Sequence, residues 1–516
     1  MRCKRILLLT PPLVQPNCPY PATTHLAGFL RRIGAQAHQL DLSIKVQLDV
    51  LRRYGGDEAD EILEVLQNPR LPPEAKLEAS AYIEELALWI RDNVDGEFGF
   101  SRYAERLSAN AFSFGAFEKL VKKRAVVDEP LERHLNAAVE RFNPSIAAVT
   151  CPFPGTLVGA FKTAAFLKRR HPRIKTVLGG GFVSSELRHM TTGKVKEYFD
   201  EVIFDEGYRP LAELAGFENA PVPPFVEPCY DGIELGEYFD VVETENPMFR
   251  LWSAGKWKRL IMARGCYWRK CAFCDVRLPY IADCVMPKAE DIVDAMENLG
   301  GGDFHFVDEA MPPSLVRAVS AEIIRRGLEC RWWGNIRFDG AYTPELCRLM
   351  ADAGCIAVTG GLECAVDRLL ALMNKGITVE SARKAMTAFR DAGIMVHAYL
   401  MYAFPTQTEN EAWEALECVR SLFRDGLIQS AFFHRFALTV HSPIAADPDR
   451  FGIEVRWPRR RNVFCLNELG FHEPGAPDWD EIGEALKLAL YNYNQSTGLA
   501  KPVGYWKKCR KRQKLR

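Results

Sequence analysis

The stretch ARGCYWRKCAFCDV at residues 263–276 decides how this chain is interpreted. It places Cys266, Cys271 and Cys274 on one short loop, with aromatic residues between them. Cys284 follows only after an extended stretch, so no fourth cysteine completes the set at similar spacing. Three thiolates leave one coordination position of a bound metal group open, and an open position indicates chemistry rather than a purely structural role.

Iron–sulfur clusters and zinc ions are both held by thiolate groups of this kind. A zinc ribbon needs a second cysteine pair about 15 to 20 residues away, and the sequence has none. The spacing therefore favours an iron–sulfur cluster. Structural zinc, and a chance grouping among the 15 cysteines of the chain, are the less favoured alternatives.

Apolar, strand-like runs alternate with helical patterns around this loop. Six strands and five helices predict a partial β/α barrel, whose functional groups lie at the carboxyl ends of the strands. The cysteine loop follows the first strand at such an end. The strands are expected at residues 258–262, 303–308, 331–338, 356–363, 395–404 and 432–440, and the helices at 288–299, 315–326, 344–353, 379–392 and 410–424.

The N-terminal part predicts an open parallel α/β sheet, with strands at 5–10, 36–42, 146–151, 175–178 and 201–204 and helices at 25–33 and 157–170. Ligands bind such sheets in the crevice at the carboxyl ends of the strands. Small residues at those ends let a bulky ligand approach the backbone. The candidate contacts are Thr10, Pro11, Thr150, Gly180, Gly181, Phe182, Glu206 and Gly207.

Residues 255–445 resemble a radical S-adenosylmethionine (SAM) domain. The usual signature has three residues between the first two cysteines, whereas this chain has Tyr267 to Lys270 there. GGLE at 360–363, LMNKGIT at 372–378 and MYAFPTQTENE at 401–411 resemble segments of the radical SAM branch that carries N-terminal cobalamin-binding domains. FALTVHSPI at 436–444 stands where a later strand of that branch has a proline-rich end.

The resemblance implies a [4Fe-4S] cluster on Cys266, Cys271 and Cys274, with SAM bound at the open iron. It further implies that the backbone near Phe273 passes the adenine and that Glu363 accepts hydrogen bonds from the ribose hydroxyls. Arg337 is expected to pair with the methionine carboxylate, the alternative being a solvated salt bridge. Asp308 and Glu309 are expected either to contact substrate or to cap a helix.

The N-terminal sheet resembles the cobalamin-binding domain of class B radical SAM enzymes. GGGF at 179–182 and DEGYRPLAEL at 205–214 stand where that family has glycine-rich segments. No Asp-x-His-x-x-Gly motif occurs, so we expect His25 to be a packing residue rather than a cobalt ligand.

The predicted domains are a Rossmann-like cobalamin-binding domain at 1–215 with a helical insertion at about 45–141, a linker at 216–254, a radical SAM partial barrel at 255–445, and an extension with a basic tail at 446–516. The aromatic stretch at 98–103 within the insertion is expected to be core. A basic tail is usually solvated or disordered.

The resemblance implies a cobalamin-dependent radical SAM enzyme, expected to methylate an unactivated carbon of a natural-product or metabolite intermediate. Cyclisation or ring rearrangement with cobalamin, and radical SAM chemistry without it, are the alternatives. Expected partners are a small-molecule or peptide substrate and an external electron donor such as flavodoxin or ferredoxin. A methylthiotransferase would need a second three-cysteine cluster near the N-terminus, and the cysteines there are too scattered.

Composition agrees with a large enzyme. A length of 516 residues with 48% hydrophobic content predicts several cores, and the net charge of −1 argues against a body that binds polyanions. The odd number of cysteines and the absence of a secretory segment indicate a reducing, cytoplasmic compartment, and no apolar run is long enough to span a membrane. A non-catalytic zinc or RNA-binding protein remains the distant alternative.

Overall fold

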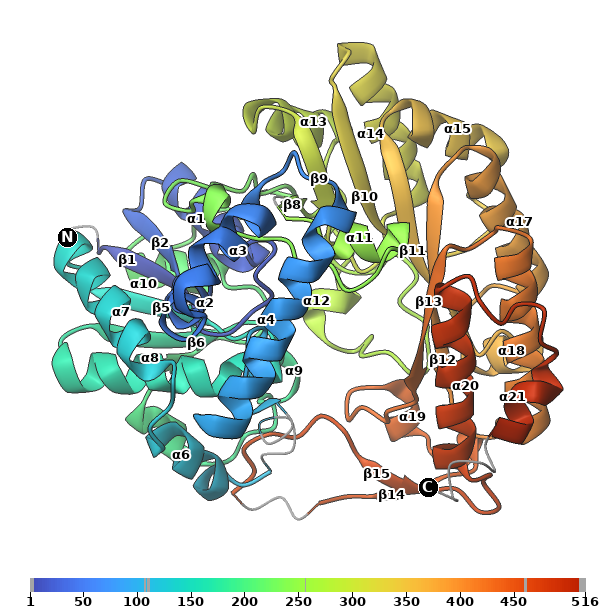
Figure 1. Cartoon of the computed structure of the whole chain (residues 1–516). Helices are drawn as coiled ribbons and strands as arrows, with labels where there is room; N and C mark the ends of the chain where they lie inside the picture. Colours follow the sequence, from blue (N-terminus) through green and yellow to red (C-terminus); the bar gives the residue numbers. More distant parts are fainter. Residues whose placement is uncertain (1–3, 106–107, 109–111, 256, 459–461, 510–516) are drawn as a thin grey trace. The chain divides into compact units, whose positions relative to one another are not determined.

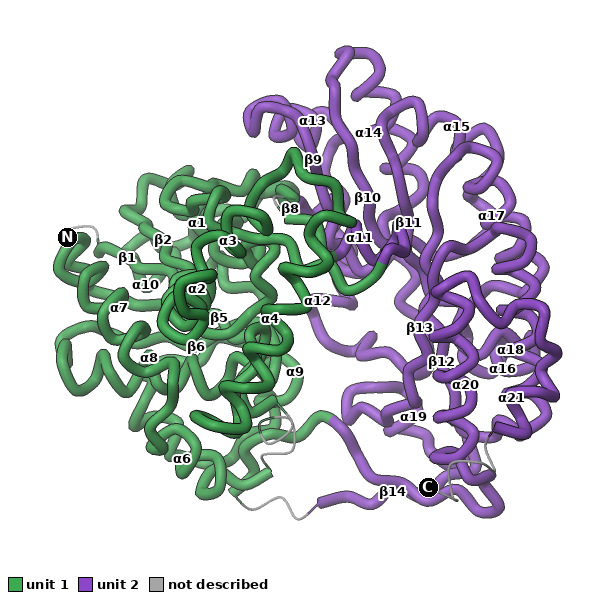
Figure 2. The backbone as a smooth tube through the Cα atoms, viewed as in Figure 1, with its two compact units in different colours: residues 1–244, 253–258, 459–467 green, residues 245–252, 259–458, 468–516 purple. Residues whose placement is uncertain are grey.

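The computed structural model describes residues 4–105, 108, 112–255, 257–458 and 462–509. The chain forms two compact units, coloured separately in Figure 2. The first unit comprises residues 1–244, 253–258 and 459–467, and the second unit comprises 245–252, 259–458 and 468–516. Each unit is built around its own parallel sheet (Figure 1).

The first unit has a five-stranded parallel sheet in the order β2-β1-β5-β6-β7. This order places the switch point, where neighbouring connections leave in opposite directions, between β1 and β5. The expected open α/β fold is therefore confirmed, although the last strand is shorter than expected. The strands are β1 (Ile6–Thr10), β2 (Ala37–Asp41), β5 (Ile146–Thr150), β6 (Lys175–Gly179) and β7 (Glu201–Val202).

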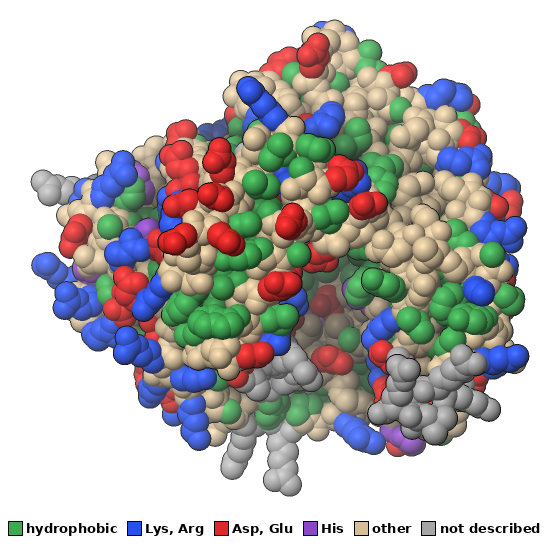
Figure 3. All heavy atoms as spheres, viewed as in Figure 1, with side chains coloured by type: hydrophobic (Ala, Val, Ile, Leu, Met, Phe, Trp, Pro, Cys, Tyr) green, Lys and Arg blue, Asp and Glu red, His purple; other side chains and the backbone are tan. Residues whose placement is uncertain are grey.

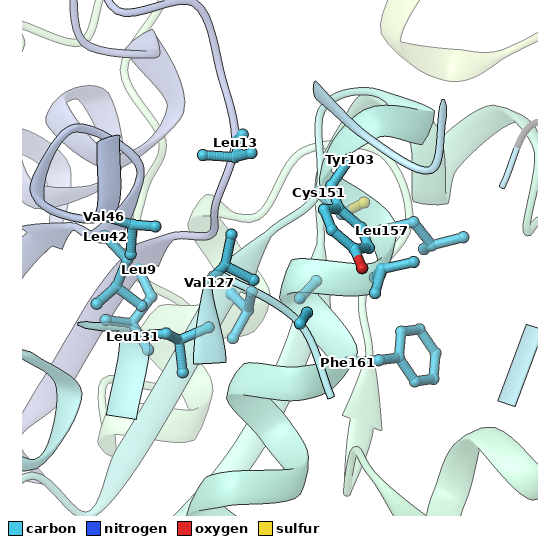
Figure 4. Close-up of a cluster of buried hydrophobic side chains, with 14 of the residues drawn as sticks. Leu9, Leu13, Leu42, Val46, Tyr103, Val127, Leu131, Cys151, Leu157 and Phe161 are labelled. Carbon is cyan, nitrogen blue, oxygen red and sulfur yellow. The ribbon is translucent and has the colours of Figure 1, made fainter. Parts of the chain in front are cut away.

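Both faces of this sheet are covered by helices, and the central strands β1 and β5 are buried at every position. Leu7 and Leu9 of β1 face one core, with helices α2 (Leu42–Tyr54), α7 (Asp128–Phe142) and α8 (Leu157–Arg170). Part of this core, including Leu9, Leu42 and Phe161, is drawn in Figure 4. Ile6 and Leu8 face the other core, with α1 (Pro21–Arg32) and α10 (Tyr208–Ala215).

The segment after β2 is mostly helical, as expected. It contains α3 (Ala59–Gln67), α4 (Pro73–Asn93) and α6 (Phe114–Lys122), besides α2 and α7. The aromatic stretch forms a short hairpin of β3 (Phe98–Gly99) and β4 (Arg102–Tyr103), not a helix. Its rings at Phe98, Phe100 and Tyr103 are buried, as a core assignment requires.

The second unit has a six-stranded sheet in sequential order from β8 to β13, and the pairings from β9 to β13 are parallel. The expected partial barrel is confirmed. Its strands are β8 (Lys258–Leu260), β9 (Gly302–Phe306), β10 (Cys330–Ile336), β11 (Cys355–Glu363), β12 (Met395–Tyr402) and β13 (Ser430–Arg435). The helices between them are α13 (Ala289–Asn298), α14 (Pro313–Arg326), α15 (Pro344–Asp352), α16 (Asp367–Leu372), α17 (Val379–Asp391) and α18 (Glu409–Arg424).

Local sequence fixes where several of these helices begin. Thr408 caps α18 by accepting from the Glu411 N–H, and the Glu411 carboxylate accepts from the Thr408 N–H in return. Thr378 and Ser381 form the same reciprocal cap on α17. Such caps satisfy donors that a helix start leaves free. They set the start of α18 after the loop that follows β12, and the start of α17 after α16.

The C-terminal part adds a hairpin of β14 (Glu454–Arg456) and β15 (Gly470–His472), then α20 (Trp479–Asn494) and α21 (Val503–Cys509). Between the two hairpin strands, residues 462–467 pack with the first unit, where Phe464 contacts Phe114 and Phe117. Most of the basic tail, at 510–516, lies outside the described residues.

Acidic and basic side chains are interspersed on the face drawn in Figure 3, as the small net charge requires. Within the described part of the chain, no helix combines the length and apolarity needed to cross a membrane.

Candidate active site

The loop that carries the three cysteines begins where β8 ends, and Asp308 accepts hydrogen bonds from the backbone at the start of that loop. The Asp308 carboxylate accepts the backbone N–H of Met262 at 2.8 Å and that of Ala263 at 2.6 Å. Its side chain is 2% exposed. Burial raises the pKa of Asp308 to about 7, and the backbone hydrogen bonds oppose the shift. Asp308 therefore positions the cysteine loop. This role accounts for a buried carboxylate just after β9 without a contact to substrate.

The first half of the loop folds back against residues 281–285. The Cys266 N–H donates to the Ile281 carbonyl at 3.1 Å, and Arg264 bridges Val285. Gly265 has φ +77°, and a Cβ there would lie 2.3 Å from the Asp283 carbonyl oxygen. Only glycine satisfies both conditions, so the turn before Cys266 depends on it.

The second half of the loop packs against the LMNKGIT segment. Trp268 Nε1 donates to the Asn374 carbonyl at 2.8 Å, and the Ala272 N–H donates to the Met373 carbonyl at 2.8 Å. A Cβ at Gly376 would lie 2.0 Å from the Trp268 ring. Two segments about a hundred residues apart in sequence thus form one continuous wall.

Arg337 follows β10 and reaches this wall. It is buried, its guanidinium lies 4.3 Å from the centroid of the Trp268 ring, and Nη1 lies 3.9 Å from Cys271 Sγ as a hydrogen-bond donor. Its Nη2 donates to the Lys375 carbonyl, and Asp339 is a 3.9 Å ion-pair partner. Arg337 is therefore a buried cation beside Cys271, and not a solvated surface arginine.

Glu363 ends β11 and forms an ion pair with Lys375. The distance from Lys375 Nζ to Glu363 Oε1 is 2.6 Å, and each side chain is 9% exposed. Burial lowers the pKa of Lys375, but Glu363 and Cys271 outweigh that effect, so the net shift is upward. Lys375 also lies 5.7 Å from the Phe273 ring. The expected ribose-binding carboxylate is thus linked to the cysteine loop by one ammonium group.

The three cysteines differ in exposure: Cys271 is buried, and Cys266 and Cys274 are partly exposed. Burial raises the pKa of the Cys271 and Cys274 thiols, with Lys375 and Arg337 opposing the shift at Cys271. Among the described residues, no three Cys, His, Asp or Glu side chains converge on a single metal ion. A cubane cluster binds each thiolate on a different iron, so it does not need that convergence.

The loops after β11 and β12 hold several non-glycine residues with left-handed backbone. These conformations cost about 1–3 kcal/mol each and concentrate at functional sites. Gln407 lies in the same loops, and its buried side-chain amide has no hydrogen-bond partner among the described residues. The strained residues are Glu363 (φ 55°), Ala365 (φ 49°), Ala403 (φ 62°) and Thr406 (φ 72°).

The first unit brings part of its predicted crevice together. Thr10 ends β1 and Thr150 ends β5, the two strands that flank the switch point. Both side chains are buried, and neither hydroxyl oxygen has a hydrogen-bond partner among the described residues. Pro11 follows Thr10 and is also buried. Two orphaned hydroxyls at such a point are available to a polar ligand.

The glycines of the crevice allow close backbone approach. Gly180 has φ +114°, and a Cβ there would lie 2.6 Å from the Cys151 carbonyl oxygen. A Cβ at Gly181 would lie 3.4 Å from the Pro152 oxygen, and one at Gly207 would touch Leu26. Phe182 is buried at the start of α9 (Gly181–Ser185), and Glu206 is exposed.

His25 is buried in α1, where its Nδ1 lies 2.9 Å from the Pro21 carbonyl oxygen. Burial lowers its pKa to about 4. Its Nε2 is buried and has no hydrogen-bond partner among the described residues, so the packing role of His25 stays a prediction.

Sequence reasoning missed Lys375, Asp339 and Gln407 as site residues. Lys375 and Gln407 stand inside LMNKGIT and MYAFPTQTENE, so a polar residue next to a family-like segment was the available signal. Asp339 had no such signal. It accepts the Tyr267 hydroxyl at 2.7 Å, a contact that depends on how the cysteine loop folds.

Comparison with known proteins relates the second unit to a family. Residues 260–419 match the model of the radical SAM superfamily. The chain is 25% identical over 412 residues to the anaerobic magnesium-protoporphyrin IX monomethyl ester cyclase of Rubrivivax gelatinosus, covering 74% of this chain and 71% of the cyclase.

Two solved structures share the fold. The radical SAM methyltransferase TsrM from Kitasatospora setae, solved with tryptophan substrate and a SAM analogue, aligns with TM-score 0.59 and 16% identity over 94% of this chain and 89% of TsrM. The cobalamin-dependent SAM radical enzyme OxsB, solved with aqua-cobalamin and SAM, aligns with TM-score 0.55 and 13% identity over 96% of this chain and 67% of OxsB. Residues 260–419 therefore carry a radical SAM domain, which indicates an enzyme, and the chain shares the fold of TsrM and OxsB.

Proposed function

We propose that this protein is a cobalamin-dependent radical SAM methyltransferase that transfers a methyl group to an unactivated carbon of a small-molecule or peptide substrate. The observation that carries the proposal is the wall formed by the cysteine loop, Arg337, Lys375 and Glu363 at the carboxyl ends of the barrel strands. It combines three thiols, two buried cations and one carboxylate within one unit.

The donor set fits a [4Fe-4S] cluster on Cys266, Cys271 and Cys274. Thiolates in a buried site are costly unless positive charge offsets them. Arg337 supplies a hydrogen bond to Cys271, and the Lys375 ammonium lies nearby. Both cations remain available to stabilise the charge of a thiolate-ligated cluster.

When bound and reduced, the cluster supplies the electron that cleaves SAM to a 5′-deoxyadenosyl radical. The chain's own residues orient SAM for that step. Glu363 is positioned to accept the ribose hydroxyls, and the backbone at Phe273 to pass the adenine. The family resemblance implies that Arg337 pairs with the methionine carboxylate, and its guanidinium lies beside Cys271. Its planar fork suits a carboxylate.

The first unit fits cobalamin. The macrocycle would lie against the strand ends at Thr10, Pro11 and Thr150, where two buried hydroxyls have no partner among the described residues. We propose that its tail runs beside Gly180 and Gly181, where the chain passes close to the backbone of Cys151 and Pro152. We assign no cobalt ligand to His25, because the sequence lacks the Asp-x-His-x-x-Gly motif.

Bound methylcobalamin, held at the strand ends of Thr10, Pro11 and Thr150, would supply the methyl group that replaces a hydrogen atom on the substrate carbon, and that hydrogen atom would leave in 5′-deoxyadenosine. An external donor such as flavodoxin or ferredoxin would reduce the cluster. We place the enzyme in the cytoplasm, because exposed cluster thiols require a reducing compartment. The cyclase relative supports one alternative, a ring-forming reaction with the same cofactors.

Anaerobic reconstitution of the full-length chain with iron, sulfide and hydroxocobalamin tests the cofactor assignment. We expect four irons and one corrinoid per chain after gel filtration, and 5′-deoxyadenosine on adding SAM and reductant. Iron without retained corrinoid would leave a cobalamin-independent radical SAM enzyme. A colourless protein with one zinc would reject the proposal. A product heavier by one methylene group separates methylation from ring formation.

A further inference from the structure

Strands β12 and β13 expose aromatic side chains on one face of the barrel sheet. Tyr399 is 37% exposed and Phe432 is 49% exposed, although large apolar side chains in a parallel sheet are usually buried. The two residues are direct neighbours in the strand register, and Met401 and His434 form the next pair on the same face. These four residues are called the ring platform below.

The ring platform faces away from the helices that cover the sheet. The alternate residues Val396, Ala398 and Leu400 are buried in the helix-covered core, and Phe433 contacts Tyr402 on that side. Because side chains alternate along a strand, the platform lies on the opposite, inner face. Glu363 ends the neighbouring strand β11, whose Gly361 pairs with Tyr399.

The buried ring of His397 packs beside the platform. The His397 ring is fully buried, lies 4.7 Å from the Tyr399 ring and 4.3 Å from the Trp252 ring, and its Nδ1 lies 2.7 Å from the Ser430 hydroxyl. Within the platform, the His434 ring lies 4.6 Å from Phe432 and 6.1 Å from Tyr399. His397 thus contacts the Tyr399 ring from the preceding position on the same face of β12, while Tyr399 and Phe432 stay partly exposed.

The platform is also next to the proposed SAM site. Burial lowers the pKa of His434, and the Glu363 carboxylate partly opposes that shift, which shows that the two groups are electrostatic neighbours. A neutral imidazole offers one donor and one acceptor. A substrate on the platform would therefore meet flat apolar surfaces and a single polar group, beside the carboxylate proposed to hold the ribose.

We propose that the ring platform of Tyr399, Met401, Phe432 and His434 binds a substrate that contains a flat unsaturated ring. This inference rests on the proposed function, because it takes the occupant to be the substrate of the radical reaction. Rings stack on aromatic faces, and thioethers favour ring edges. The four side chains carry no Lys or Arg that would recognise a phosphate, so an anionic headgroup is not the recognised part.

The test uses the full-length chain and two neutral bicyclic lactams of similar size, 2-quinolinone and its octahydro counterpart. They share the amide group and differ in whether the ring system is flat and unsaturated. Calorimetry and ligand-observed NMR should show that 2-quinolinone binds about tenfold more tightly. Phe432→Leu keeps apolar volume but removes the ring, and should reduce that preference to about twofold. Tyr491→Leu is the matched control, since Tyr491 is a 65% exposed aromatic on α20.

Equal affinity for the two lactams, or no detectable binding of either, would overturn the inference. So would a preference that survives in both Phe432→Leu and the second variant, Met401→Ala. Iron content measured on the same preparations separates this result from failure of the proposed function. Chains that hold four irons but do not discriminate the lactams contradict only the ring platform, whereas chains that never assemble a cluster contradict the proposed function.

Discussion

Lys375 and Glu363 form a buried ion pair, with 2.6 Å between Nζ and Oε1 and 9% exposure of each side chain. The pair joins the end of β11 to the segment that packs on the cysteine loop. Its geometry depends on the left-handed backbone of Glu363 and on Gly361, where a Cβ would lie 2.0 Å from Glu363 Oε1. The carboxylate proposed to hold the SAM ribose is therefore fixed in place before SAM binds.

Removing the ammonium should destabilise the second unit. Lys375→Met leaves the Glu363 carboxylate buried without its cation, which costs about 3–5 kcal/mol. The double variant Lys375→Met/Glu363→Gln should recover part of that loss, because no charge stays buried. Denaturant unfolding of the four members of the cycle measures the coupling. The exposed pair Lys384–Glu380, with side chains 75% and 68% exposed, supplies the control. Lys384→Met should change stability by less than about 1 kcal/mol.

Glu363→Ala should weaken SAM binding while the cluster still assembles. Hydrogen bonds to a charged group contribute about 1.5–3 kcal/mol each, so losing the ribose contacts should raise the Kd for SAM by tenfold or more. Equilibrium dialysis with the reconstituted enzyme measures the affinity, and iron content shows whether the cluster is intact. An unchanged Kd with four irons would assign Glu363 to the ion pair alone.

Replacing any one of Cys266, Cys271 or Cys274 by alanine should abolish cluster assembly and SAM cleavage. Each supplies one of three protein ligands. Cys284→Ala is the control, because this thiol belongs to the same fold-back region but not to the proposed ligand set. It should retain the iron content and visible absorption of the unmodified chain. Full 5′-deoxyadenosine production by any of the three ligand variants would contradict the assignment.

Gly376→Ala should disturb the cysteine loop more than its backbone strain alone predicts. Gly376 has φ +73°, and the added methyl group would collide with the Trp268 ring. Gly393 has nearly the same conformation, φ +77°, with no atom within 4 Å of a Cβ. Gly393→Ala should therefore show only the strain of about 1–2 kcal/mol. Gly376→Ala should lose more stability and reduce iron content. Equal effects of the two variants would show that the Trp268 contact is unimportant.

The strands of both sheets were predictable because their apolar runs are bounded by Gly, Pro and Thr. Residues 356–363 were expected as a strand, and the observed strand is Cys355–Glu363. Ala357 and Val358 give it an apolar run, and two glycines stand near its end. The position of the cysteine loop followed from the same pattern. These features depend on local sequence, so a single sequence is enough to predict them.

Contacts between distant segments were not predictable in the same way. The pairing of Asp308 with the N–H groups of Met262 and Ala263 depends on how β8 and β9 align, and its sequence signal resembles that of a helix cap. Residues 462–467 return to the first unit because Phe464 fills a gap beside Phe114. Nothing in the local sequence of that segment distinguishes it from its neighbours, so only the fold reveals the contact.

Asp308 should make the folding stability of the second unit depend measurably on pH. Burial raises the pKa of its carboxyl from 3.8 to about 7, so the folded state binds a proton that the unfolded state has released between these values. The contribution of Asp308 to stability is therefore constant below about pH 4, falls as the pH rises to about 7, and is constant above it. Asp308→Asn cannot ionise and should remove this slope, which amounts to a few kcal/mol. It should also lower stability overall, because an amide has one acceptor oxygen for two backbone donors.

Thermal unfolding of the full-length chain at several pH values from 4 to 8 measures this difference in stability. Asp352→Asn, at the exposed end of α15, is the control and should show the same pH dependence of thermal unfolding as the unmodified chain. If Asp308→Asn and the unmodified chain showed the same pH dependence, the Asp308 carboxyl would not titrate in this range.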